Sequence, residues 1–317
     1  MCFLTVPNSV INYHNPKSNI MKFLSFSRVA LALLATSVSL LMFSCKKDAA
    51  EKSPAVTESE ATEYSTESME AESSFDDVQD LSMTAADEEG VASAGKPAGT
   101  AGRPFPFLKL RLRIGANAVI TVSPDDNTYP KTVTIDFGDG NNCPDGKFRK
   151  GKIVLHFTGP IRHPGSVLTI TLADFQVGRA KIEGTKVITN LSENGNIKFS
   201  VQVTGGKITF PNGRGYTHER LKYVKQIAGA ATDDVSDDIY SIEGRSETKF
   251  NNGVAIVMTT GTALIKKVSC PWISDGTLKI KVNSYEFLLD YGYPNNADCD
   301  NKALLKWESK EKIILLP

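Results

Sequence analysis

Apolar and polar residues alternate with a period of two along most of the chain beyond Pro104. The first such run has leucine or isoleucine at every second position from Leu108 to Ile114, with lysine or arginine between them. This pattern predicts a half-buried β-strand with a basic outer face. Further runs of this kind predict strands over residues 118–122, 132–137, 152–157, 167–172, 180–188, 197–203, 207–210, 239–242, 254–259, 277–282, 286–291 and 313–316.

Turn signals such as Asp139-Gly140 and Asp275-Gly276 separate the predicted strands. No amphipathic helix longer than about two turns is indicated. The best candidate, residues 217–226, is equally compatible with a strand. Residues 104–317 are therefore predicted to form a single all-β domain, either a large antiparallel sandwich or a partly open barrel. A domain of this length can bury about 70% of its unfolded surface in one core.

Two stretches near the ends of this domain, residues 133–155 and 287–315, share an order of features. Each has a strand, an Asp-aromatic-Gly sequence, a polar loop with a cysteine, and a second strand. If both stretches form hairpins, their similarity predicts that one half of the domain is an internal duplicate of the other, related to it by a pseudo-twofold axis. Chance similarity between two β-hairpins is the alternative.

An apolar run of a different kind lies near the N-terminus. Lys22 and Arg28 come before residues 29–43, which are apolar except for three hydroxyl residues. The run is too short for a comfortable membrane span, which needs about 20 residues, so residues 21–44 are typical of a secretory signal peptide. We expect translation to begin at Met21, because Asn, Pro and Ser crowd residues 1–20, which are predicted to be an untranslated leader.

The signal ends in Met42-Phe43-Ser44-Cys45, which resembles the lipobox of bacterial lipoproteins, although Met42 and Phe43 depart from its usual residues. The resemblance implies cleavage by signal peptidase II and acylation of Cys45 by chains such as palmitate, which would anchor the protein to a lipid bilayer. With its Asp-aromatic-Gly hairpins, the chain also resembles uncharacterised β-rich lipoproteins of the Bacteroidota. That implies an outer membrane lipoprotein, periplasmic or surface-exposed. An ordinary signal peptide or an uncleaved anchor is the alternative.

The net charge of zero conceals segments of opposite charge. Residues 46–103 hold 14 acids and 5 bases, a net of −9, whereas residues 104–317 hold 28 bases and 22 acids, a net of +6. The acidic segment has too little apolar surface to offset the entropy of ordering, so residues 45–103 are predicted to be the acylated cysteine and a disordered tether. The basic excess of the β-domain is expected to face solvent or to contact this tether, and nucleic acid is not expected as a partner.

Cys2 lies in the predicted leader, so three cysteines besides Cys45 remain in the exported protein, in an oxidising setting. Cys270 and Cys299 flank a predicted hairpin over residues 277–291. Because the outer ends of a hairpin lie side by side, we predict a disulfide between Cys270 and Cys299, with Cys143 free. A disulfide between Cys143 and Cys299 is the alternative.

Two polar loops concentrate oxygen atoms that could bind a cation. Calcium prefers flexible clusters of about six to eight oxygens, so these loops are candidates for a calcium site. Neither loop keeps the spacing of an EF-hand, and acidic hairpin tips are usually solvated turns. The candidate ligands are Asp136, Asp139, Asn141 and Asp145 in the first loop and Asp290, Asn296, Asp298 and Asp300 in the second.

The sequence lacks the common motifs of enzyme active sites, including the G-x-S-x-G elbow and the P-loop. His156 is predicted to be a packed strand histidine, and His163 lies in a loop. His218 lacks the second histidine of a zinc-binding helix. No residue is therefore nominated as catalytic, and no cofactor is expected apart from calcium.

These observations predict a membrane-anchored exported lipoprotein with a non-enzymatic β-domain for binding, of a glycan or an envelope protein, or for envelope structure. One alternative is a polysaccharide hydrolase with carboxylates such as Asp136 and Asp290 in one cleft. Another is a carrier of lipids or lipoproteins, which requires a curved sheet with a dry apolar cavity. The presence of a cavity therefore distinguishes these functions.

Overall fold

The computed structural model describes residues 55–94, 107–231, 237–293 and 296–316. The predicted leader, the signal peptide and Cys45 lie outside these residues. Within the described ranges, neither helix is long and apolar enough to cross a membrane.

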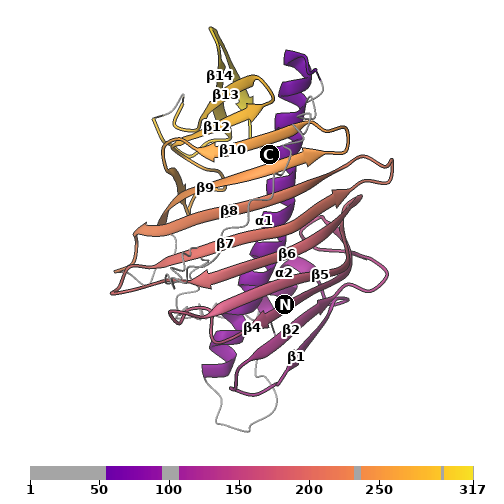
Figure 1. Cartoon of the computed structure of the whole chain (residues 1–317). Helices are drawn as coiled ribbons and strands as arrows, with labels where there is room; N and C mark the ends of the chain where they lie inside the picture. Colours follow the sequence, from indigo (N-terminus) through magenta and orange to yellow (C-terminus); the bar gives the residue numbers. More distant parts are fainter. Residues whose placement is uncertain (1–54, 95–106, 232–236, 294–295, 317) are drawn as a thin grey trace, which may run out of the picture.

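One antiparallel sheet of 15 strands makes up most of the molecule (Figure 1). The strand row begins with β1 and ends with β15, and the sheet does not close on itself. The predicted fold class, an all-β sandwich or partly open barrel, is confirmed. The order is β1-β2-β4-β5-β6-β7-β8-β9-β10-β12-β13-β14-β15, with β3 beside β4 and β11 beside β9. The strands are β1 (Val119–Ser123), β2 (Lys131–Asp136), β3 (Asn141–Asn142), β4 (Phe148–Phe157), β5 (Val167–Val177), β6 (Ala180–Asn190), β7 (Lys198–Thr209), β8 (Gly215–Ala228), β9 (Ile239–Phe250), β10 (Ala255–Thr260), β11 (Leu264–Lys267), β12 (Thr277–Val282), β13 (Tyr285–Asp290), β14 (Lys302–Trp307) and β15 (Lys310–Leu315).

Register shifts interrupt the pairing of neighbouring strands from β4 to β8, and two of them contain glycines that allow close approach. A Cβ on Gly184 would lie 2.8 Å from the Cα of Gly206. A Cβ on Gly206 would lie 2.2 Å from the backbone oxygen of His218 and 3.0 Å from the ring of Phe75. Since irregularities of this kind bend a sheet, these glycines allow the strands to curve around Phe75.

A helix of 37 residues, α1 (Glu58–Ala94), crosses the strands and packs against the sheet (Figure 1). The prediction of a disordered tether over residues 45–103 is therefore wrong for the residues that form α1. Thr57 and Glu60 form a capping box, in which each side chain accepts a hydrogen bond from the other's backbone N–H. Buried positions recur along α1 at helical spacing, and most of them are small or polar: Ala61, Ser65, Ser68, Ala71, Phe75, Val78, Gln79, Ser82, Ala85, Ala86 and Glu89.

The segment Leu108–Ile114 forms a short helix, α2, so the strand predicted there is wrong. In the helix Leu110 and Ile114 lie four positions apart on one face, and both are fully buried. The carboxylate of Glu88, on α1, accepts hydrogen bonds from two backbone N–H groups in the first turn of α2. Packing against α1 thus outweighs the alternating pattern. The other helix candidate, residues 217–226, is extended and belongs to β8.

The two similar stretches of sequence do not form equivalent hairpins. In the first stretch, β2 pairs directly with β4. In the second stretch, β13 and β15 both pair with β14, which lies between them. The prediction of a duplicated half is therefore wrong, because Ala303, Leu304 and Leu305 of β14 are buried and build an additional strand into the second stretch.

Candidate functional site

The face of the sheet that packs against α1 carries buried cations, and these pair with acids of the helix. The guanidinium of Arg220 lies 2.7 Å from carboxylate oxygens of both Glu72 and Asp76. Arg149 lies 3.0 Å from Asp77. The basic domain thus contacts its acidic segment, which is one of the two arrangements expected from the sequence, and we call this set of pairs the ionic seam. The ionic seam also includes pairs whose cations are more exposed or lie on α2 and in loops. Its other pairs are Lys131–Glu89, Lys186–Asp76, Lys147–Asp77, Arg113–Asp77, Arg162–Asp87, Lys222–Glu72 and Arg214–Glu67.

His218 lies within the ionic seam and is fully buried. Its Nδ1 lies 3.0 Å from the hydroxyl of Thr248, which accepts a hydrogen bond from Ser68. The Thr248 hydroxyl can therefore donate its own proton to Nδ1, which places the imidazole proton on Nε2, 3.5 Å from Glu72. The ring stacks on Phe75 with 5.2 Å between centroids. Helix and sheet thus meet at a histidine whose ring is held by the Thr248 hydroxyl and by stacking on Phe75, whereas Nε2 has no hydrogen-bond partner within the described residues.

Burial lowers the pKa of His218 to about 4, so the ring is neutral near pH 7. Burial alone would raise the pKa of Glu72, but the charges of Lys222 and Arg220 outweigh it and hold that pKa well below its usual range. The ionic seam therefore places a neutral histidine beside an ionised carboxylate that already has cationic partners. This arrangement is typical of a structural ion-pair network.

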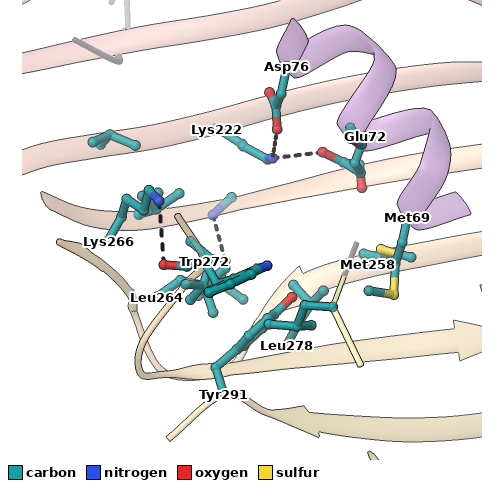
Figure 2. Close-up of a pocket in the computed structure, with 18 of the residues that line it drawn as sticks. Met69, Glu72, Asp76, Lys222, Met258, Leu264, Lys266, Trp272, Leu278 and Tyr291 are labelled. Atoms are coloured by element: carbon teal, nitrogen blue, oxygen red, sulfur yellow. Dashed lines mark hydrogen bonds and ion pairs between the residues drawn. The ribbon is translucent and has the colours of Figure 1, made fainter. Parts of the chain in front are cut away.

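A half-open pocket of about 340 Å³ lies beside the ionic seam, between α1, strands β8 to β12 and the loop that follows β11 (Figure 2). This volume is at the lower end of the range found for small-molecule sites. The wall is mainly apolar, and its larger apolar side chains are Met69, Ile242, Met258, Leu264, Trp272, Leu278 and Tyr291.

Several hydrogen-bond donors of the pocket wall have no partner within the described part of the chain. The two on aromatic rings are the indole N–H of Trp272 and the hydroxyl of Tyr291. Figure 2 shows the polar ends of both rings turned toward the side of Met69 and Met258. Burial raises the pKa of Tyr291, and the charge of Glu72 raises it further, so the hydroxyl keeps its proton near neutral pH. Both groups are therefore neutral donors that a bound molecule could use.

Charged groups of the pocket wall already interact within the protein. Lys222 lies 2.7 Å from Glu72 and 3.6 Å from Asp76, as the dashed lines in Figure 2 show. The ammonium of Lys266 donates to two backbone carbonyls of the loop that follows β11. Arg245 pairs with a glutamate of its own strand. A charged ligand would have to compete with these contacts, whereas a neutral acceptor would not.

The predicted disulfide between Cys270 and Cys299 is confirmed, with 5.5 Å between the Cα atoms. Cys143 is a free, buried cysteine, as predicted. The disulfide joins the loop that carries Trp272 to the segment that follows Tyr291. The two unpaired donors thus lie on segments that a covalent bond holds together.

The candidate calcium ligands do not gather into a metal site. Among the described residues, no three acidic, histidine or cysteine side chains cluster as a metal site would require. The acids pair with nearby cations instead, because Asp136 lies 2.6 Å from Lys152 and Asp145 lies 2.7 Å from Arg149. Of the remaining candidates, Asp290 pairs with Lys306, Asn141 is buried, Asp139, Asn296 and Asp298 are exposed, and Asp300 accepts a hydrogen bond from the backbone N–H of Lys302.

The two carboxylates expected in a hydrolase cleft lie far apart in the sheet. Asp136 ends β2, and Asp290 ends β13, near opposite ends of the strand row. Each pairs with a lysine of a nearby strand. The expectation that Asp136 and Asp290 share one cleft is therefore wrong, because β2 and β13 lie near opposite ends of the strand row.

Of the three histidines of the domain, only His156 lies in an environment other than the one predicted. His156 is exposed on β4, and its Nδ1 lies 3.3 Å from the Thr132 hydroxyl. The prediction of a packed histidine is wrong, because Leu155 and Phe157 on either side take the buried positions of the alternating strand. His163 lies in an exposed loop, as predicted.

No family model, no curated protein and no solved structure matches the chain. The candidate site therefore depends on the geometry of this protein alone. Sequence reasoning missed the pocket, whose walls come from segments far apart in the chain. One signal was available: Trp272 and Tyr291 both lie between the two cysteines of the predicted disulfide.

Proposed function

We propose that the protein is an exported lipoprotein, anchored to a membrane through Cys45, whose β-domain binds a small molecule in the pocket beside α1. The observation that carries the binding function is the pocket itself, with a mainly apolar wall and two neutral donors that have no partner among the described residues. The charged residues nearby are held in ion pairs, which favours binding over catalysis.

The lipobox-like end of the signal, Met42-Phe43-Ser44-Cys45, supports the anchor. Because α1 begins at Glu58, 13 residues after Cys45, the chain between them can span at most about 45 Å. Glu58 accepts a hydrogen bond from the indole of Trp307 on β14, at 3.0 Å. An anchor at Cys45 would therefore hold the end of the molecule with β14 nearest the bilayer, and the pocket lies in that half.

A lipid carrier is the second candidate function, and the apolar wall of the same pocket supports it. A carrier would release its ligand to an acceptor membrane, whereas a binding module would retain it. Transfer of a labelled ligand from the protein to vesicles would distinguish the two.

Metabolic labelling tests the anchor. Cells supplied with labelled palmitate should label the wild-type protein and leave Cys45→Ser unlabelled, with Cys143→Ser as a matched control that keeps the label. A labelled Cys45→Ser protein would refute the anchor.

Fluorescence titration tests the pocket. The neutral apolar probe N-phenyl-1-naphthylamine should gain emission on binding to the full chain, and Leu278→Trp, which fills the pocket, should abolish this gain. Leu112→Trp is the matched control, because Leu112 is exposed on α2, away from the pocket. Equal probe binding by both variants, or none by the wild type, would contradict the proposed function.

A further inference from the structure

Building on the proposed binding function, we infer that the pocket takes an amphiphile with a single apolar chain and an uncharged oxygen acceptor, such as the ester of a monoacylated glycerol. In this arrangement Trp272 and Tyr291 hold the acceptor, and the chain lies against Met69 and Met258. Wall, donors, charges and size each contribute to this assignment.

The apolar wall can adapt to an alkyl chain. Met69 of α1 and Met258 of β10 lie on the same side of the pocket (Figure 2). Methionine side chains are flexible and polarisable, so they follow the shape of a varied apolar partner. Met69 and Leu278 are only half-buried, and an alkyl chain in the pocket would remove their apolar surface from water.

The two donors specify an oxygen acceptor. Trp272 and Tyr291 are half-buried, and neither the indole N–H nor the hydroxyl has a hydrogen-bond partner within the described residues, so both are available to a bound molecule. A carbonyl oxygen has two lone pairs and can accept from both groups. The disulfide links the two segments that carry these donors, which reduces the freedom lost when a ligand binds.

The charges of the pocket favour a neutral head group. Glu72 and Asp76 are both bound to Lys222, and Lys266 donates to backbone carbonyls, so a charged ligand would have to compete with contacts that the protein already makes. A carboxylate or an ammonium entering this pocket would also lose hydration. A neutral ester or amide avoids that cost.

The volume limits the number of chains. About 340 Å³ is close to the minimum for a small-molecule site, so the pocket suits one chain and not the two chains of a phospholipid. The ligand class is therefore a single-chain neutral amphiphile.

Three ligands with the same dodecyl chain test the head group: glycerol monolaurate, laurate and dodecyltrimethylammonium. Each is titrated below its critical micelle concentration into the full chain with Cys45→Ser, by displacement of N-phenyl-1-naphthylamine. We expect the neutral ester to bind at least tenfold more tightly than either charged ligand. Tighter binding of laurate or of the ammonium would overturn the inference and leave the proposed binding function intact, whereas failure of the probe itself to bind would overturn both.

Two conservative variants test the donors. Trp272→Phe and Tyr291→Phe keep an aromatic ring and remove one hydrogen bond each, so each should weaken ester binding roughly three- to tenfold and leave probe binding unchanged. Trp307→Phe and Tyr285→Phe are matched controls, since neither residue lines the pocket. Urea unfolding of each variant confirms that it folds. Unchanged ester affinity in both folded pocket variants would refute the assignment.

Discussion

Acidification should destabilise the folded protein through His218. Folding lowers the pKa of this imidazole from 6.5 to about 4, so at pH values between these limits the unfolded chain binds a proton that the folded protein does not. The stability contributed by the neutral ring is therefore complete above pH 6.5 and is lost as the pH falls toward 4. At about 1.36 kcal/mol for each pKa unit, the complete loss amounts to about 3 kcal/mol.

Other groups titrate near this range, so the effect of His218 must be measured as a difference between two proteins. Glu72 and Asp76 of α1 face His218, as do Arg220 and Lys222 of its own strand. The pKa of Glu72 is lowered, so its contribution to the stability of the folded protein is also lost on acidification, but at a lower pH than the contribution of His218. A variant that removes only the imidazole isolates its contribution.

His218→Gln supplies that comparison, because glutamine is polar and does not titrate. The free energy of unfolding should be measured by urea titration at constant ionic strength from pH 7.5 to 4.5. The wild type should lose most of the 3 kcal/mol over this range, whereas His218→Gln should not show this loss. The unfolding free energies of the two proteins should therefore converge or cross as the pH falls. His156→Gln, at an exposed histidine of β4, should follow the wild type.

Parallel stability curves for the wild type and His218→Gln over this range would refute the reasoning. If His218→Gln does not fold, the imidazole resonances of the wild type give a second test. The His218 ring should remain neutral at pH 5, and a midpoint near 6.5 would show that burial does not control its charge.

Three further predictions concern α1 and the disulfide. Burial outweighs the charge of its partner Arg162 and raises the pKa of Asp87 to about 7, so the wild type should lose up to about 4 kcal/mol relative to Asp87→Asn as the pH rises from 4 to above 7, measured by urea unfolding. Phe75→Ala should cost about 3–5 kcal/mol of unfolding free energy, whereas Leu112→Ala, at a side chain 73% exposed, should cost less than about 0.5 kcal/mol. Replacing Cys270 and Cys299 together by serine opens a link across 29 positions and should cost about 3.5 kcal/mol, which thermal unfolding with and without reductant can check.

The strands could be predicted from sequence because their alternation reflects burial on one face. In β2, for example, Val133 and Ile135 are fully buried and alternate with partly exposed residues. Alternation failed over Leu108–Ile114, where a helix buries every fourth residue instead of every second. A run of seven residues contains too few positions to distinguish these periods once charged residues separate the apolar ones.

The long helix α1 was missed because its buried face has little apolar surface of its own. Alanine, serine and acids occupy most of the buried positions, and that composition is typical of disorder. The acids become favourable to bury only when Arg149 or Arg220 faces them, and these cations lie more than 70 positions away in the sequence. A local pattern cannot contain this information. The pocket was missed for the same reason, because its walls form only after α1 has packed.

The ionic seam fixes the register of α1 more than it drives the helix onto the sheet. Buried ion pairs recover little net free energy, because desolvation offsets most of their attraction. Burial of Phe75, Val78 and Leu81 therefore provides the main attraction. The repeating pattern of small buried residues would nevertheless permit a slip of seven positions along the helix, and such a slip would place Ser65 and Met69, or Gln79 and Met83, where Glu72 and Asp76 now meet Arg220. A buried cation that loses its partner destabilises the fold by about 3–5 kcal/mol. The loss of these pairs in the slipped register therefore disfavours that register.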